Sequence, residues 1–271
     1  MVNNFVIKKN QKLIDGKKAS PLNVAQYAAE YFALKKRQEG HGGIWRFFHK
    51  QENEDRMKLL ETMEKSLKSL LNEGDEILVP TPCYSLWSNC AYLVGAKPVY
   101  YMCDEAAGWF PDINDMKSKV TSRTKAIVII NPNNPTGALY SKDVLEKIAQ
   151  IARENDLMIF SDEIYDRLLF DGAVHIPMAT VAPDLFVVTM NGLSKSHCLC
   201  GFRVGWMVIS GPKEATRDYR ESIIKLTTLR LCSNALAQLV IPAALGDVEY
   251  TDSMVRPGGR IYEQSRATVS A

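Results

Sequence analysis

The stretch AIVIINPNNPTG, residues 126–137, decides how the fold is interpreted. Its first five residues are continuously apolar, which is typical of a strand buried on both faces of a parallel sheet. The Asn- and Pro-rich residues that follow favour a turn and end the strand at Asn131. This arrangement places polar residues at the carboxyl edge of a sheet, where α/β proteins bind their ligands.

The same pattern recurs on both sides of this stretch. Runs typical of strands lie at Glu76–Pro80, Pro98–Tyr101, Ala126–Ile130, Leu157–Ser161, Leu185–Thr189 and Val204–Ile209. Helical spacing of apolar residues predicts helices from Ser20 to about Gly40, and at about Asn53–Asn72, Ser141–Asn155 and Pro212–Leu231. Strands that alternate with helices predict an α/β fold, with a mostly parallel sheet sandwiched by helices.

Composition argues against several protein classes. The chain has 271 residues, of which 46% are hydrophobic, so it can bury a sizeable core. Its net charge of +2 comes from intermixed acids and bases, which gives no field that favours nucleic acid. No apolar run is long enough to span a membrane, and the polar, lysine-rich start does not resemble a secretory signal. Because the six cysteines form no paired framework, we expect a reduced, cytoplasmic setting.

Polar motifs follow three of the predicted strands. The segment 131–137 follows one strand, Asp162-Glu-Ile-Tyr165 follows the next, and Asn191-Gly-Leu-Ser-Lys195 follows the third. Each motif alone has a structural explanation, as a turn, a helix cap or a solvated lysine. Their placement after successive parallel strands predicts that they meet in one crevice.

These motifs carry a family resemblance. NPNNPTG (131–137), DEIY (162–165), NGLSK (191–195) and GFR (201–203) resemble the fold-type I aminotransferases, and the similarity runs from about Leu70 to Arg266. The phrases GDEILVPTPCYSLW, CDEAAGWFPD and RPGGRIYEQ are most similar to bacterial glutamate–pyruvate (alanine) aminotransferases. The resemblance implies pyridoxal 5′-phosphate (PLP) as cofactor, a PLP-transferase-like large domain and a homodimer. It also implies amino-group transfer between L-alanine and 2-oxoglutarate, giving pyruvate and L-glutamate.

The resemblance also implies roles for individual residues. Lys195 matches the Schiff-base lysine, which carries the proton to and from the substrate α-carbon. Asp162 matches the carboxylate that keeps the pyridine nitrogen protonated. Asn134 and Tyr165 match the donors to the cofactor's phenolic oxygen, and Asn134 also matches a contact to the substrate carboxylate.

Two further cofactor contacts are implied in the same way. Tyr84 matches the aromatic residue that stacks on the cofactor ring. Arg203, eight residues after Lys195, matches the arginine that binds the phosphate, a task that suits a guanidinium.

The pair Cys198-x-Cys200, directly after His197, has a metal-site interpretation. Structural zinc sites show two spaced ligand pairs, and the sequence has no second pair. We therefore expect no metal here, and ordinary thiols packed beside a loop.

The sequence also departs from the family. The family's phosphate cup is a Gly- and Ser-rich turn, whereas the aligned residues Arg56–Glu61 have the pattern of a helix interior. The interpretation that follows is a divergent helical segment at 1–66, a PLP-binding large domain at 67–255 and the start of a connecting helix at 256–271, with the small C-terminal domain missing. We expect weak PLP binding from such a chain, and poor turnover of alanine or none at all. The alternatives are an impaired or inactive aminotransferase fragment, or another PLP reaction such as a β-lyase.

Overall fold

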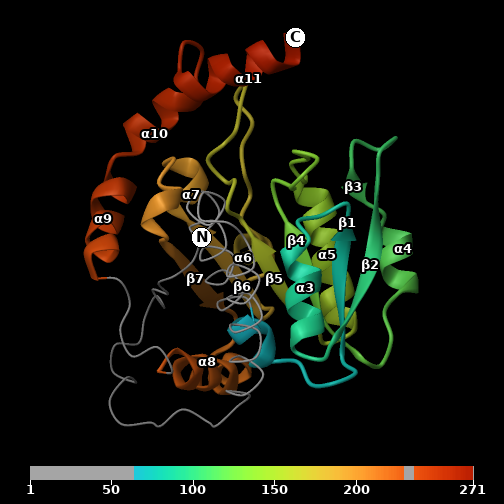
Figure 1. The fold of residues 1–271 in the computed structure, drawn as a ribbon. Helices are drawn as coiled ribbons and strands as arrows, with labels where there is room; N and C mark the ends of the chain where they lie inside the picture. The colour runs from blue at the N-terminus through green and yellow to red at the C-terminus, as the bar shows by residue number, and fades with distance from the viewer. Residues whose placement is uncertain (1–63, 229–234, 271) are drawn as a thin grey trace, which may run out of the picture.

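A computed structural model describes residues 64–228 and 235–270 of the chain (Figure 1). The helix predicted from Ser20 and the aligned cup segment lie outside these residues, as does most of the second predicted helix. Its described part is helical at 64–68 and turns at 69–70, so it ends earlier than predicted. Gly74, expected to end this helix, lies in the turn before the first strand with φ +82°.

In the described part of the chain, seven strands form one sheet. They are β1 (Glu76–Thr81), β2 (Lys97–Asp104), β3 (Phe110–Pro111), β4 (Thr124–Ile130), β5 (Met158–Asp162), β6 (Val187–Gly192) and β7 (Gly205–Ser210), in the spatial order β3-β2-β1-β4-β5-β6-β7. The five central strands are parallel, while β3 and β7 pair antiparallel at the two edges. The prediction of a mostly parallel sheet is confirmed. Only β3 was not predicted, because two residues are too few to show a period.

Helices connect the strands. They are α3 (Leu86–Leu93), α4 (Ile113–Ser118), α5 (Lys142–Glu154), α6 (Met178–Val181), α7 (Leu193–Ser196), the 3₁₀ turn η2 (Cys200–Phe202), α8 (Lys213–Thr227), α9 (Ala235–Gly246), α10 (Val248–Val255) and α11 (Arg260–Ser270). Ser141 caps α5 by accepting a hydrogen bond from the Val144 amide at 3.4 Å. Helices α5 and α8 confirm the predictions for these segments, although residues 229–231 lie outside the described part.

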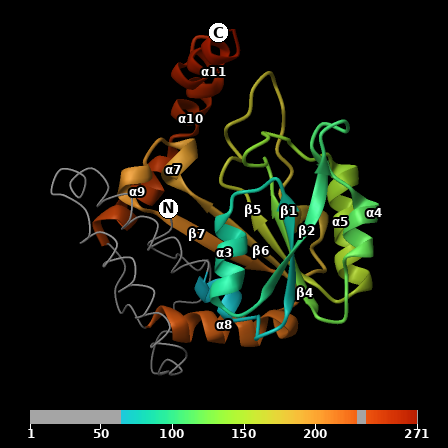
Figure 2. The ribbon, with the colours of Figure 1, turned by 45° about the vertical axis from the view of Figure 1, so that its right-hand side comes forward.

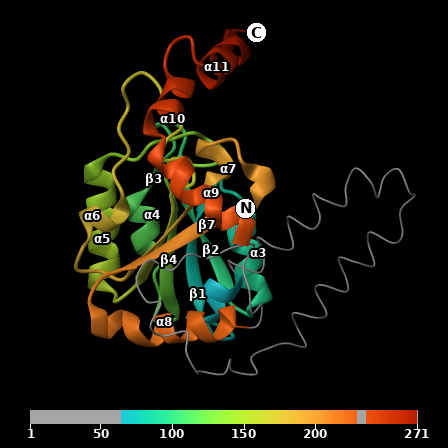
Figure 3. The ribbon, with the colours of Figure 1, turned by 90° about the vertical axis from the view of Figure 1, so that its left-hand side faces the viewer.

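The sheet divides the core into two layers because alternate side chains of a strand point to opposite faces. In β4, Val128 packs with Trp87 of α3 and Tyr219 of α8, whereas Ile127 and Ile129 pack against the side covered by α4, α5 and α6. Figures 2 and 3 show α5 and α3 on opposite faces of the sheet, and α8 across the end of the strands away from α7. The predicted helical cover on both faces is therefore confirmed.

The last three helices lead away from the sheet. Helices α9, α10 and α11 follow one side of the molecule towards the C-terminal end, passing close to α7 (Figure 1). Near the start of α11, the Tyr262 hydroxyl donates to Asp171 Oδ1 at 3.3 Å, in the long loop after β5. Within the described ranges, no helix is long and apolar enough to cross a membrane.

Candidate active site

The carboxyl ends of β4, β5 and β6 bring the three polar motifs together. Ile130 pairs with Asp162 in register, and Asp162 pairs with Met190 on the next strand. The Asn131 amide donates to the Asp162 carbonyl at 3.0 Å, and the Glu163 amide donates to Met190 at 2.9 Å. The parallel ladder therefore continues into the first residues of the motifs and fixes where their side chains begin.

Lys195 lies in the short helix α7, directly after β6. Gly192 joins the two elements, and a Cβ atom there would lie 2.7 Å from the Val204 carbonyl oxygen, so only glycine fits. The Lys195 ammonium lies 5.7 Å from the centroid of the Tyr165 ring. The Tyr165 hydroxyl in turn accepts a hydrogen bond from Asn134 Nδ2 at 3.3 Å. One residue from each motif therefore contributes to a single group.

Asp162 belongs to the same group. Its Oδ2 accepts a hydrogen bond from Trp87 Nε1 at 3.2 Å, and its Oδ1 accepts one from the Ile164 amide at 3.3 Å. The pKa of the Asp162 carboxyl is raised above its ordinary value because the group is buried. These two donors and the positive charge of Lys195 offset part of the increase. A half-buried carboxylate within electrostatic reach of an amine is a suitable partner for a cationic ligand group.

Trp87 was not singled out in the sequence. It is fully buried in α3 and its ring lies 5.6 Å from that of Phe160, so its sequence pattern is that of a core residue. Its indole N–H is the feature that links it to the site, and no local pattern indicates where that N–H points.

The Trp87–Asp162 hydrogen bond gives a testable coupling. A hydrogen bond to a charged acceptor contributes about 1.5–3 kcal/mol. We expect Trp87→Phe to lower the free energy of unfolding by at least this amount at neutral pH, and by less in an Asp162→Asn background. Urea denaturation of the wild type, both single variants and the double variant measures the coupling energy. Strictly additive losses would show that the bond does not hold Asp162.

Tyr84 and Arg203 lie on segments beside this group. Tyr84 is half-buried in the turn between β1 and α3, where its carbonyl accepts from the Trp87 amide at 3.3 Å. Arg203 ends the turn after η2 with a left-handed backbone, φ 55° and ψ 48°, and its Nη1 donates to the Cys200 carbonyl. Burial lowers the pKa of the Arg203 guanidinium. The roles of both residues towards a cofactor stay predictions.

A histidine fixes the far end of α7. His197 Nδ1 lies 2.8 Å from Ser196 Oγ, and His197 Nε2 lies 2.8 Å from the Ala244 carbonyl oxygen and 3.2 Å from Thr251 Oγ1. Because a carbonyl can only accept, Nε2 carries a hydrogen, and the Ser196 hydroxyl beside Nδ1 also donates to the Gly192 carbonyl at 3.4 Å. His197 therefore joins the lysine helix to α9 and α10. Cys198 and Cys200 beside it are free and exposed, not packed as predicted.

A second set of buried polar residues lies behind Asp162. Glu163 Oε1 accepts from Ser161 Oγ at 2.8 Å and from the Met178 amide at 3.0 Å. Glu163 Oε2 lies 3.8 Å from His175 Nε2, and the two side chains are only 5% and 7% exposed. Burial, opposed in part by the two donors to Oε1, raises the pKa of Glu163 to about 7 from an ordinary value of 4.5.

This raised pKa predicts a pH dependence of stability. The folded chain holds the Glu163 proton more tightly than the unfolded chain, so the resulting stabilisation is complete below about pH 4.5 and is lost as the pH rises towards 7. Its full size is about 3 kcal/mol, at 1.36 kcal/mol for each pH unit. We expect Glu163→Gln to remove this decline in stability. Urea denaturation of both proteins at several pH values across the range in which the Glu163 carboxyl titrates measures it. Equal slopes in the two proteins would contradict the assignment.

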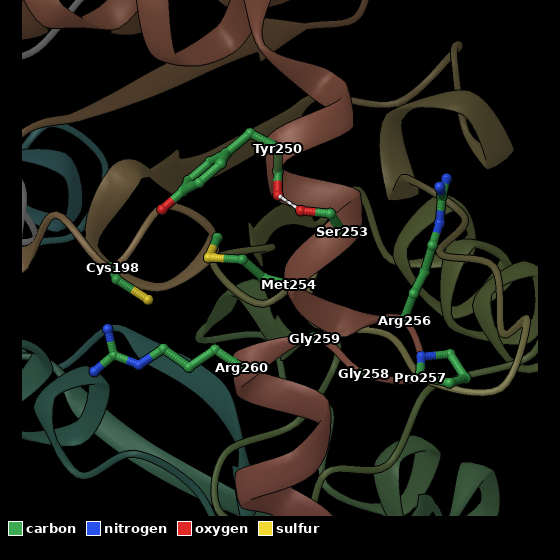
Figure 4. Close-up of a pocket in the computed structure, with 9 residues that line it drawn as sticks. All are labelled: Cys198, Tyr250, Ser253, Met254, Arg256, Pro257, Gly258, Gly259 and Arg260. Carbon is green, nitrogen blue, oxygen red and sulfur yellow. Dashed lines mark hydrogen bonds between the residues drawn. The ribbon is translucent and has the colours of Figure 1, made fainter.

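A separate cavity of about 580 Å³ lies between the loop after α7 and the turn that joins α10 to α11. Figure 4 shows Arg260 reaching towards Cys198, while Arg256 points away from it. Arg256 pairs with Asp252 at 3.5 Å within α10. This cavity contains none of the residues predicted for the cofactor.

Comparison with known proteins places this geometry in context. Residues 61–268 match the family model described as aminotransferase class I and II. The glutamate–pyruvate aminotransferase AlaA of Haemophilus influenzae is 53% identical over 204 residues, which are 75% of this chain and 50% of that protein. An aminotransferase structure from Escherichia coli is 50% identical with a TM-score of 0.74, covering 76% of this chain and 51% of the other. An alanine aminotransferase from Pyrococcus furiosus is 42% identical with a TM-score of 0.68, covering 72% and 51%. The chain spans about half the length of the relatives it matches.

Proposed function

We propose, from the premise that the chain belongs to the class I and II aminotransferase family, that it binds PLP at the carboxyl edge of its sheet through Lys195. Enzymes of this family are PLP-dependent. The observation that carries the proposal is the group formed by Lys195, Tyr165, Asn134 and Asp162, which come from three successive strand ends.

The chemistry of this group fits PLP. An amine can attach the cofactor's aldehyde, a buried carboxylate can face its ring nitrogen, and an amide N–H with a phenol O–H can donate to its phenolic oxygen. Asp162 suits the second task because Trp87 and the Ile164 amide already hold its carboxylate in place. We assign Tyr84 to packing against the ring and Arg203 to the phosphate.

Each residue then has a defined task in amino-group transfer. When bound, PLP supplies an electron sink for the α-carbon of an amino acid. Lys195 moves the proton at that α-carbon as a general base and acid. Asp162 holds a proton on the ring nitrogen, and the Asn134–Tyr165 pair orients the donors at the phenolic oxygen. Asn134 also binds the substrate carboxylate.

The substrates we propose are L-alanine and 2-oxoglutarate, with pyruvate and L-glutamate as products. This assignment is supported by the names of relatives that are about half identical to the chain, among them glutamate–pyruvate and alanine aminotransferases. We further propose a homodimer located in the cytoplasm. We assign residues 67–255 to the PLP-binding large domain, residues 256–271 to a connecting helix and residues 1–66 to a divergent segment.

The experiment is an amino-transfer assay on the purified protein with added PLP. We expect L-alanine to yield pyruvate only together with L-glutamate from 2-oxoglutarate. Pyruvate released from β-chloroalanine without any 2-oxo acid would instead indicate a β-lyase. If neither product forms and no imine absorption appears at saturating PLP, the proposed function is wrong.

A further inference from the structure

The loop between β5 and α6 carries Tyr165 away from the sheet. It contains two consecutive turns: the Leu168 amide donates to the Tyr165 carbonyl at 2.9 Å, and the Ala173 amide donates to the Phe170 carbonyl at 3.0 Å. The tip of the loop, residues 171–174, is exposed. A segment with so little buried surface opens easily unless another part of the chain holds it.

Helix α11 holds the second of these turns. The Tyr262 hydroxyl donates to Asp171 Oδ1 at 3.3 Å and accepts from Arg266 Nη1 at 3.0 Å. The Tyr262 side chain belongs to a residue that is only 8% exposed, and its ring packs against that of Phe170 with the centroids 6.1 Å apart. Tyr262 therefore gives the loop both an apolar contact and a hydrogen bond, and the two partners of its hydroxyl are charged groups, which strengthen such bonds.

This contact lies close to Tyr165 along the chain. For residues 167–174, the hydrogen bond from Tyr262 is the one that comes from outside the loop within the described chain. Leu168 closes the first turn and Phe170 opens the second. Two residues of chain span at most about 7 Å, so the turn held by Tyr262 cannot move far from the turn that begins at Tyr165. Figure 1 shows this loop reaching α11.

Helix α11 is itself attached to the helix that carries Lys195. At the end of α7, His197 Nε2 lies 3.2 Å from Thr251 Oγ1 of α10. A tight turn then joins α10 to α11, in which the Gly259 amide donates to the Arg256 carbonyl at 2.8 Å. One continuous support therefore connects the lysine helix to the loop after β5.

We propose that α11 sets the separation of Tyr165 and Lys195, and that Tyr262 is the positioning residue that holds Tyr165 through the loop. The Lys195 ammonium lies 5.7 Å from the centroid of the Tyr165 ring, whose hydroxyl accepts from Asn134 at 3.3 Å. The positioning role rests on the function proposed above, where Tyr165 donates to the cofactor's phenolic oxygen. The attachment of the loop by Tyr262 does not rest on that function.

The chain offers variants that separate these contributions. Tyr262→Phe removes the hydroxyl and keeps the ring that packs on Phe170, whereas Tyr262→Ala removes both. Asp171→Asn keeps an oxygen that can accept from Tyr262, so it preserves the attachment. Tyr250→Phe is the matched control, because Tyr250 lies on the neighbouring α10, is 57% exposed, and has a hydroxyl without a hydrogen bond in the described part of the chain.

The attachment is tested on the protein without PLP, by hydrogen exchange measured with mass spectrometry. We expect Tyr262→Phe to speed exchange in peptides that cover residues 165–174 by about two- to tenfold, the factor that one hydrogen bond contributes to an equilibrium constant. Tyr262→Ala should speed it further, because the ring contact is also lost. Asp171→Asn and Tyr250→Phe should stay close to the wild type.

Helix α5 serves as the internal reference in this experiment, because it packs on the other side of the core from α3 and α8 and does not touch the loop tip through any hydrogen bond in the described residues. Unchanged loop exchange in both Tyr262 variants, or an equal increase in α5, would overturn the attachment.

The positioning role is tested by the pH at which the visible absorption of attached PLP changes. A donor to the phenolic oxygen draws negative charge from it, so the proton on the nitrogen that links PLP to Lys195 is lost more readily. Loss of this donor should therefore move the midpoint to higher pH. We expect the full shift in Tyr165→Phe and a smaller shift in the same direction in Tyr262→Phe.

The double variant shows whether Tyr262 acts through Tyr165. In the Tyr165→Phe background, Tyr262→Phe should add nothing to the shift. An equal shift in both backgrounds, or no shift in a Tyr262→Phe protein whose loop exchange has increased, would overturn the positioning role. If the wild type attaches no PLP, the proposed function fails, while the exchange result still decides the attachment of the loop.

Discussion

Lys195→Ala is expected to abolish both PLP attachment and amino transfer. Lys195 is the amine that lies against Tyr165 and acts on Asp162, and it carries two tasks in the proposed reaction. Loss of a general base alone costs about 10²–10⁴-fold in rate, and loss of the attachment adds to this. The measurements are the visible absorption of the PLP-treated protein and the rate of pyruvate formation from L-alanine.

The matched control for Lys195→Ala is Lys125→Ala. Lys125 is an exposed lysine near the amino end of β4, whereas the site lies at the carboxyl end of this strand. It lines a different surface cavity. Its removal should leave the absorption band and the rate unchanged. A Lys195→Ala protein that retains the band would show that another amine attaches the cofactor.

Asp162→Asn is expected to reduce the rate of amino transfer by about 10²–10³-fold, the usual cost of removing a preorganised electrostatic contact. An amide cannot hold a proton on a ring nitrogen by charge, although it keeps nearly the same shape. The fold should survive because the amide oxygen can still accept from Trp87 or Ile164. Steady-state rates at saturating PLP and L-alanine separate this effect from weaker binding.

A surface carboxylate provides the control for this substitution. Asp184 forms a two-pronged ion pair with Arg153 at 2.7 and 2.9 Å, before the amino end of β6, whereas the site lies at the carboxyl ends of the strands. Asp184→Asn should change neither rate nor affinity. If Asp162→Asn retains the wild-type rate, then Asp162 does not face the ring nitrogen.

Much of the sheet was predictable because its strands are buried on both faces. Ala126–Ile130 and Leu157–Ser161 are near-continuous apolar runs, and both are strands within one or two residues of the prediction. The edge strand β3 has two residues and no pattern of its own. The proximity of Asn134, Asp162 and Lys195 was predictable too, because motifs at the ends of parallel strands share an edge.

The supporting residues were not predictable in the same way. Trp87 contacts Asp162 across 75 residues of sequence, and His175 meets Glu163 from a loop, so neither contact leaves a local pattern. Glu163 stands in a recognised motif, but its pattern does not show that its carboxyl is buried beside a histidine. Only the packing of α3 and of the loop before α6 against the end of β5 makes these contacts.

Borohydride reduction followed by peptide mapping shows directly whether Lys195 attaches PLP. Reduction of the PLP-treated 271-residue protein converts an imine to a stable amine, and mass spectrometry then locates the modified residue. We predict a single modified lysine, Lys195, in the peptide that contains NGLSK. An adduct on a different lysine, or no adduct at saturating PLP, would contradict attachment at Lys195.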